Sequence, residues 1–546
     1  MSHHMQPRSS MISVIVMLLL LGGCKVGPNY TVPEASVADA WLETDNLVVK
    51  PEESDNYRWW EVFDDPVLND LIDSAYDQNL TLQIAGLRIL EARARRGIAA
   101  GRFFPQLQQL SAGVGAFNLS DNDPNAFPLD RNFNDTSVGF DAMWELDFWG
   151  KFRRGIESAD AALLSSVANY DQVLVSLIGE VAATYVRTRM FEKRLALARA
   201  NVELQKRTLE IAQVRFNNGA VTELDVTEAR SNLENTEALV PQFVDGVRQS
   251  RITLSILLGM PPSNLDDRLG DPGVIPIAPA EVIVGIPANL LRRRPDVRSA
   301  ERMAAAMCAQ IGVAEADFYP SVRVLGSTGF RTGDSIGADG FQKDIGNLFD
   351  SDSFYGFIGL SVSWPILNYG RIANNVRVHD AQFQQAIVNY QDTVLRAAAE
   401  VESGLSSYLQ SRNRAAHLAQ SVAATERSVE LSLQQYRDGT ATFLRTLAAQ
   451  SSLVVKQDQL ATTESRIALH LISTYKSLGG GWEIRRGREF IPAPMQQEMV
   501  KRTNWGKIMA PDYDEGSDML FARPKSDVPP QEPQLTQSTQ ETSNGS

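Results

Sequence analysis

The chain has 546 residues, with 52 Lys and Arg against 66 Asp and Glu, a formal net charge of −14 and a pI near 5.0. This acidic balance argues against nucleic acid as a partner, because binding to a phosphate backbone needs a basic surface. The only two cysteines are Cys24 and Cys308, and none of the five His lies near either, which leaves little basis for a disulfide framework or a Cys/His zinc site.

The amino terminus has the pattern of a secretion signal. The apolar run 11–21 is about half of what a bilayer span needs, which indicates a signal h-region. The residues that follow, up to Cys24, resemble a bacterial lipobox, so we expect residues 1–23 to be removed and Cys24 to carry the lipid. Several acyl chains would hold the protein firmly on a membrane. Lys25 stands where lipoproteins retained in the inner membrane typically carry Asp, a resemblance that points to the outer membrane. The alternative is an ordinary secreted protein whose signal happens to end in Cys.

Two pairs of segments have the period of β-strands. In residues 136–146 the apolar side chains of Val138, Phe140 and Trp144 alternate with polar ones, and residues 354–364 repeat this alternation. Residues 107–117 and 321–330 are predicted to be their hairpin partners, across polar loops at 118–135 and 331–353.

Strands of about ten residues with aromatic ends match a transmembrane β-barrel. A soluble sheet lying on a helix would show the same alternation. If the strands are in a membrane, four of them cannot close a barrel, so other chains must complete the sheet.

The segment after Gly150 has a helical period. Apolar residues recur at steps of four and three, as in the seam of a coiled coil, and the second half of the chain repeats the frame from Phe383 to Val401. No proline interrupts residues 150–216, so a single helix of ~100 Å is predicted at 1.5 Å per residue. Two ordinary helices with a hidden break are the alternative.

Turns are predicted at residues 215–225 and 435–445. Gly219 and Gly439 suit the left-handed position past a helix end, and Thr222 and Thr442 suit the N-cap of the next helix. Asp225 is expected to complete a capping box in the first copy. Ordinary helical hairpins would explain all of these residues without any function.

The two halves of the chain are related by an internal duplication. At an offset of 220, Trp144 falls on Trp364, Tyr170 on Tyr390 and Gly219 on Gly439. One structural unit is therefore expected twice, at residues 76–259 and 291–482.

The usual catalytic patterns are missing from the sequence. There is no His-Glu-x-x-His, no Walker-type phosphate loop and no Gly-x-Ser-x-Gly elbow, so no catalytic residue, metal or cofactor is predicted. Beyond Val528 the composition predicts a disordered tail.

Taken together, the residues resemble the outer membrane factors of tripartite efflux systems, the TolC-like ducts, in their NodT/OprM-type lipoprotein branch. The resemblance spans about residues 20–485. Its marks are Cys24-Lys25-Val26-Gly27-Pro28-Asn29-Tyr30, Trp59-Trp60 with Phe63-Asp65-Pro66-Leu68, Arg293-Arg294-Pro295-Asp296-Val297 and Gly479-Gly480-Gly481-Trp482.

The resemblance implies a mixed fold in which a long α-helical coiled-coil barrel crosses the periplasm beneath a transmembrane β-barrel. A homotrimer would supply four strands per protomer to a twelve-stranded barrel. A collar would use the lipid-anchored segment 24–75, the linker 260–290 and part of 483–546, which also holds the tail. The expected partners are outer membrane lipid, a periplasmic adaptor protein and an inner-membrane pump of the resistance-nodulation-division (RND) type.

By the same resemblance, the two turns would form the periplasmic tip, where an adaptor docks and an iris closes the duct. The residues expected at the docking tip are Asn217, Asn218, Gly219, Thr222, Asp438, Gly439 and Thr442. Family members often close the iris with an Asp and an Arg, but the matching positions hold Ala448 and Ser451. Tyr436 and Leu444 are candidates to replace them.

Three functions follow as hypotheses. The first is a passive export duct, the second a structural lipoprotein that tethers envelope layers, and the third a lipid-anchored enzyme. The amphipathic strands favour the duct over the tether. The cargo is left open, since drugs, metal ions and other small molecules pass through similar ducts.

Overall fold

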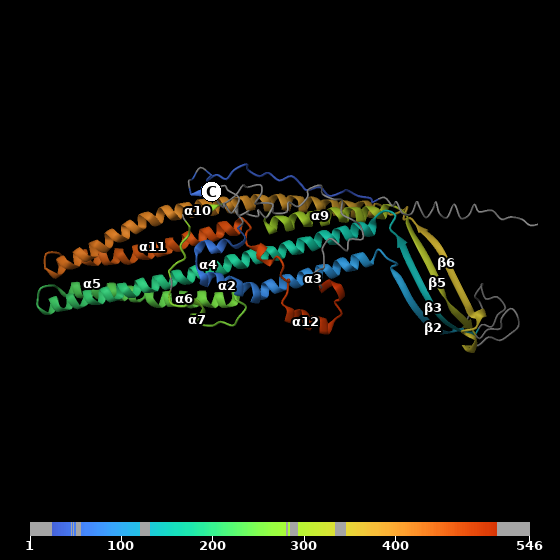
Figure 1. Ribbon diagram of the computed structural model, residues 1–546, viewed down its shortest axis with the longest axis horizontal. Helices are drawn as coiled ribbons and strands as arrows, with labels where there is room; N and C mark the ends of the chain where they lie inside the picture. Colours follow the sequence, from blue (N-terminus) through green and yellow to red (C-terminus); the bar gives the residue numbers. More distant parts are fainter. Residues whose placement is uncertain are drawn as a thin grey trace, which may run out of the picture.

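The computed structural model describes residues 25–44, 46, 48–50, 56–118, 120, 132–272, 274–279, 282–283, 293–333 and 345–509. The molecule is long and narrow, with a bundle of helices over most of its length and a β-sheet at one end (Figure 1). The predicted signal segment 1–23, Cys24, most of the two polar loops and the predicted tail lie outside the described residues.

In each half of the chain a helix is followed by two strands, a long helix and a returning helical segment. In the first half the helices and strands are β1 (Val49–Lys50), η1 (Asn56–Phe63), α2 (Pro66–Gln78), α3 (Leu80–Gly101), β2 (Leu107–Asn118), β3 (Asn132–Leu146), α4 (Lys151–Asn217), α5 (Glu223–Glu237), α6 (Leu239–Leu257) and α7 (Asp266–Leu269). In the second half they are β4 (Val282–Ile283), α9 (Pro295–Glu315), η2 (Ala316–Phe318), β5 (Ser321–Gly333), η3 (Ile345–Asn347), η4 (Ser351–Ser353), β6 (Phe354–Ser363), α10 (Arg371–Arg437), α11 (Phe443–Ser477), η5 (Trp482–Arg485), α12 (Ala493–Arg502) and η6 (Gly506–Met509).

The long helices α4 and α10 have 67 residues each. Each begins directly after a glycine with positive φ, Gly150 or Gly370. At 1.5 Å per residue each helix is about 100 Å long. The prediction of one uninterrupted helix is confirmed for 150–216, and the alternative with a hidden break is wrong.

The returning helices differ between the halves. In the second half α11 is one helix of 35 residues, whereas the first half has α5 and α6, separated at Ala238. Pro241 lies just after this break, and Ala461 occupies the position 220 residues later. Because proline lacks an amide hydrogen and crowds the preceding turn, the first copy cannot continue as a regular helix there.

The predicted strands form one four-stranded antiparallel sheet in the order β2-β3-β5-β6. The register is continuous, with Phe140 opposite Leu110 on β2 and opposite Thr328 on β5, and Val324 opposite Leu360 on β6. The outer edges of the sheet, on β2 and β6, have no partner strand among the described residues. Both predicted hairpins are therefore present, joined side by side through β3 and β5.

The long helices pack side by side in a layer that extends away from one end of the sheet. In the half near the sheet the order of contact is α3, α4, α9 and α10, and in the far half α4 contacts α5, α6 and α11, while α11 contacts α10 (Figure 1). An apolar core lies partway along α4 and includes Trp60, Val282 and Tyr475, while Trp59 stacks on Tyr475 with ring centroids 5.6 Å apart. Segments that are far apart in sequence therefore pack around the helices at the same height along the long axis of the molecule. The short strands β1 and β4 pair in parallel there.

Candidate functional site

One face of the sheet is apolar and exposed. The strand register directs paired residues of all four strands to this face. Many of them are exposed large apolar residues: Leu110, Val114, Phe140, Ile358, Leu360 and Val362. Ile358 is 82% exposed and Leu360 72% exposed. An apolar patch of this extent marks a surface that meets lipid or another protein.

The opposite face of the sheet carries charged and hydroxyl groups, together with the exposed rings of Phe117 and Phe357. Asp141 accepts hydrogen bonds from Ser327 Oγ at 2.8 Å and Ser111 Oγ at 3.2 Å, so three strands are joined across this face. Arg323 Nε donates to Glu145 Oε2 at 3.0 Å, and Arg331 Nε donates to an oxygen of Asp135 at 2.8 Å. This face is therefore suited to water.

The two faces together indicate a sheet that separates lipid from an aqueous interior. Its strands have 10 to 15 residues, which at about 3.3 Å per residue is enough to cross a bilayer core when tilted. Open edges in lipid would leave backbone groups unpaired, so a sheet that lies in lipid would need further strands beside β2 and β6. Among the described helices, α4 alone has an apolar window long enough to cross a membrane, but 61% of that window is buried within the chain.

The far end of the helix layer is formed by two helical turns with the same geometry. Gly219 has φ 71° and Gly439 has φ 75°, as predicted for the residue past a helix end. Gly219 N donates to Phe216 O at 2.8 Å, and Gly439 N donates to Tyr436 O at 3.1 Å. These bonds satisfy carbonyls at the ends of α4 and α10, so the chain reverses within a few residues.

Tyr436 holds the two turns together from inside the protomer. Its ring is 1% exposed and packs edge-on against Phe443, and the guanidinium of Arg215 lies 4.6 Å from its centroid. The hydroxyl lies 3.5 Å from Asp225 Oδ2. Burial raises the pKa of Tyr436, and the carboxylate of Asp225 raises it further, so the phenol stays neutral.

This arrangement changes the role expected for Tyr436 and Asp225. A ring buried inside one protomer does not line an opening, so Tyr436 is a packing residue of the tip in this conformation, whereas Leu444 is 63% exposed. The capping-box prediction for Asp225 is wrong: Thr222 and Thr442 do occupy N-cap positions, but neither makes a side-chain cap hydrogen bond. The Asp225 carboxylate meets Tyr436 across the hairpins, a contact that spacing along one helix cannot reveal.

The remaining predicted tip residues lie at the surface of the two turns. Asn217, Asn218 and Asp438 are exposed, and Asn217 Oδ1 accepts a hydrogen bond from Gln213 Nε2 at 3.1 Å. At the positions expected for the iris, Ala448 is exposed and Ser451 Oγ donates to Asn232 Oδ1 at 2.9 Å. Ser451 therefore binds within its own protomer.

The segment that follows Cys24 is fixed where the sheet meets the helices. The buried Arg154, in the first turn of α4, donates to Val26 O at 3.0 Å and to Gly27 O at 2.8 Å. Lys25 forms an ion pair with Glu157. Sequence reasoning did not single out Arg154, because its partners are backbone carbonyls more than 120 residues away.

The family model described as outer membrane efflux protein matches the chain twice, at residues 71–260 and 286–480. Nodulation protein T from Rhizobium leguminosarum bv. trifolii is 33% identical over 443 residues, covering 81% of this chain and 91% of that protein. A pyoverdine export outer membrane protein, OpmQ, from Pseudomonas putida is 28% identical over 434 residues, covering 78% of this chain and 88% of that protein.

Solved structures show the same architecture. The outer-membrane channel OprN is 32% identical with a TM-score of 0.78, covering 84% of this chain and 100% of that one. The Neisseria gonorrhoeae MtrE outer membrane channel, in its open state, is 25% identical with a TM-score of 0.70, covering 84% of this chain and 99% of that one.

Proposed function

The chain belongs to the outer membrane efflux protein family, and we propose that it is the outer membrane duct of a tripartite efflux system. In this role it receives small molecules from an inner-membrane pump of RND type through a periplasmic adaptor. It releases them passively across the outer membrane. The family consists of channels rather than enzymes, so the energy for export comes from the pump.

The observation that carries this proposal is the sheet with one exposed apolar face and one charged face. Four strands are too few to enclose a pore, and the unpaired edges of β2 and β6 lie at opposite sides of the sheet. Pairing β6 of one protomer with β2 of the next closes the sheet with no free edge. Three protomers give twelve strands, with the apolar faces toward lipid and the charged faces toward water.

The helix layer supports the same assembly. The stretch of α10 near the sheet is mostly exposed and presents Val388 and Leu395, one heptad apart. Such spacing is typical of a coiled-coil seam. A ring of three protomers covers both edges, because the α10 edge of each copy meets the α3 edge of its neighbour.

The contacts of residues 25–27, directly after Cys24, support a position for the proposed lipid anchor. Arg154 and Glu157 hold residues 25–27 against the start of α4, close to Gly150 and the base of β3. A lipid on Cys24 would therefore enter the inner leaflet of the outer membrane beside the barrel. Anchor and barrel would act at the same height in the envelope.

The adaptor is proposed to dock at the two turns. Asn217, Asn218, Gly219 and Thr222 form one turn, and Asp438, Gly439 and Thr442 form the other, at the end of the molecule farthest from the sheet (Figure 1). Tyr436 sets the spacing of the turns, and Leu444 is the exposed candidate for the constriction.

Measurements of mass and of conductance together test the proposed trimeric duct. Purified protein in mild detergent should have the mass of three protomers and should produce ion currents in planar bilayers. A folded monomer would contradict the shared barrel. A trimer that never conducts, even after the tip is loosened by Leu444→Gly, would favour the structural tether. The matched control is Leu224→Gly, at the position 220 residues earlier on the other turn.

A further inference from the structure

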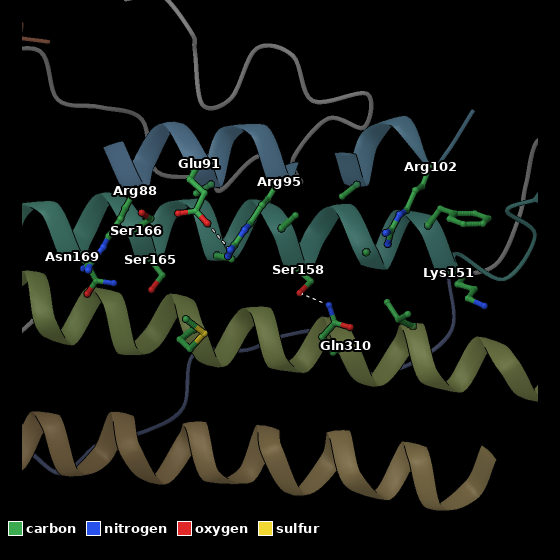
Figure 2. A pocket seen from close by; sticks show the side chains of 18 residues that line it. Arg88, Glu91, Arg95, Arg102, Lys151, Ser158, Ser165, Ser166, Asn169 and Gln310 are labelled. Carbon is green, nitrogen blue, oxygen red and sulfur yellow. Dashed lines mark hydrogen bonds and ion pairs between the residues drawn. The ribbon is translucent and has the colours of Figure 1, made fainter. Parts of the chain in front are cut away.

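A groove of about 630 Å³ runs along α4 between α3 and α9, next to the sheet (Figure 2). Four cationic side chains line it: Arg88 and Arg95 from α3, Arg102 directly after α3, and Lys151 from the first turn of α4. Glu91 is the one acidic residue in its lining. This basic surface contrasts with a chain whose formal net charge is −14.

The three arginines form a ladder along the long axis of the molecule. They recur every seven residues, so they share one face of α3 and are about 10.5 Å apart at 1.5 Å per residue. Figure 2 shows them reaching from α3 across the face of α4. Arg95 pairs with Glu91 and Lys151 pairs with Asp317, whereas Arg88 and Arg102 have no acidic partner within the described part of the chain.

The rest of the groove is neutral and can meet both polar and apolar parts of a ligand. Ser165, Ser166 and Asn169 lie along α4, and Gln310 on α9 donates to Ser158 Oγ at 2.7 Å. Ala99, Gly155 and Met303 supply small or apolar surface between them. A slender organic molecule with spaced negative charges fits this lining better than a compact ion.

The groove opens on the aqueous side of the helix layer. Arg93, about half a helical turn from the arginine ladder on α3, is buried on the other side and donates to Ile508 O at 3.1 Å. Likewise Asp171, bound by Arg485, faces away from Asn169 on α4. The carboxy-terminal segment therefore covers one side of the layer, and the groove lies on the other.

The same side continues into the polar face of the sheet. Lys151 and Phe152 line both the groove and a second hollow, of about 250 Å³, whose lining includes Glu145 and Arg323 from that face. In the proposed duct, the polar face of the sheet is the wall of the lumen. The arginine ladder thus lies on the lumen wall, just below the barrel.

We infer that this groove is a transit site for amphipathic organic anions, such as molecules carrying several carboxylate, sulfonate or phosphate groups. The inference rests on the proposed duct for its placement in the lumen, but the groove itself is built within one protomer. Cations a heptad apart would pass an anion from one site to the next, and their exposure keeps each contact weak enough for release. The cargo favoured at this point in the duct is anionic.

Equilibrium dialysis of naphthalene-1,3,6-trisulfonate against the detergent-solubilised protein tests this inference. Arg88→Gln, Arg95→Gln and Arg102→Gln combined should raise the dissociation constant at least tenfold, whereas the three Arg→Lys changes should keep it within about threefold. The matched control is Lys501→Gln, Arg502→Gln and Lys507→Gln, which removes the same charge from exposed positions in the carboxy-terminal segment. Spermidine, a trication, should not bind.

Equal trisulfonate binding by the Gln variant and the wild type would overturn the inference. So would a wild-type protein that binds no trisulfonate, the result expected if acidic groups of a neighbouring protomer neutralise the ladder. Mass and bilayer conductance, measured on the same samples, report separately on the proposed duct. Because the groove lies within one protomer, the dialysis result decides the anion site whichever way those two measurements fall.

Discussion

Replacing Ile358 by Lys places a charge on the apolar face of the sheet, at the fifth of the ten residues of β6. The side chain is 82% exposed and its partner across the strands is Gly326, so the substitution removes almost no packing within the chain. Its cost then comes from lipid. A Lys at the bilayer midplane of a β-barrel costs ~2–4 kcal/mol, which is roughly 6–12 kcal/mol for three copies in a trimer.

The matched control is Ser361→Lys on the same strand. Ser361 faces the charged side of the sheet, opposite Arg323, so a new Lys there meets water and one like charge, at a cost of at most about 1 kcal/mol. Urea titration of protein folded into lipid vesicles gives the free energy of unfolding of each variant. The unheated trimer band on a gel gives its assembly.

The assignment of the apolar face to lipid predicts a clear order of stability. Wild type and Ser361→Lys should be close together, and Ile358→Lys should be well below both. Equal stability of the two Lys variants would refute the assignment of the apolar face to lipid. A reversed order would mean that the sheet is inverted, with its charged face outward.

Three further predictions concern the tip and the anchor. Gly219→Val with Gly439→Val imposes strain of order 1–2 kcal/mol per turn, because both positions have positive φ; cross-linking to the adaptor should fall while the trimer persists, and normal docking would place the tip elsewhere. Cys24→Ser should abolish incorporation of radioactive palmitate and leave the trimer assembled; labelling that persists would disprove the lipobox. Tyr436→Ala should cost about 3 kcal/mol locally and speed amide exchange in both turns, whereas Tyr436→Phe should change little, since the contact of the hydroxyl with Asp225 is long; unchanged exchange in the Ala variant would show that the ring does not hold the tip.

Local periods in the sequence were sufficient to locate the four strands and the long helix after Gly150. Alternation of apolar and polar residues located all four strands, because successive side chains of a strand point to opposite faces. The absence of proline between Gly150 and Phe216 predicted a continuous helix, since no residue in that stretch breaks the backbone hydrogen bonds. Pro241, which accompanies the break between α5 and α6, is a signal of the same kind in the sequence.

Contacts between distant segments were decided only by the tertiary structure. The spacing of Asp225 from Thr222 suits a capping box, yet its carboxylate meets Tyr436 because two hairpins 220 residues apart lie side by side. Arg154 binds carbonyls of residues 26 and 27, and backbone carbonyls leave no trace in residue identity. The boundaries of the predicted domains, and the docking and iris residues as functional sites, remain predictions.

For the three arginines of the ladder, sequence determines one property and packing determines another. Its heptad spacing on α3 is written in the sequence, so the shared face of Arg88, Arg95 and Arg102 follows from helix geometry alone. Which way that face points does not, because it depends on where α4, α9 and the carboxy-terminal segment pack around α3. Sequence periodicity fixes the direction of a side chain relative to its own helix axis, and only packing fixes that axis relative to the rest of the molecule.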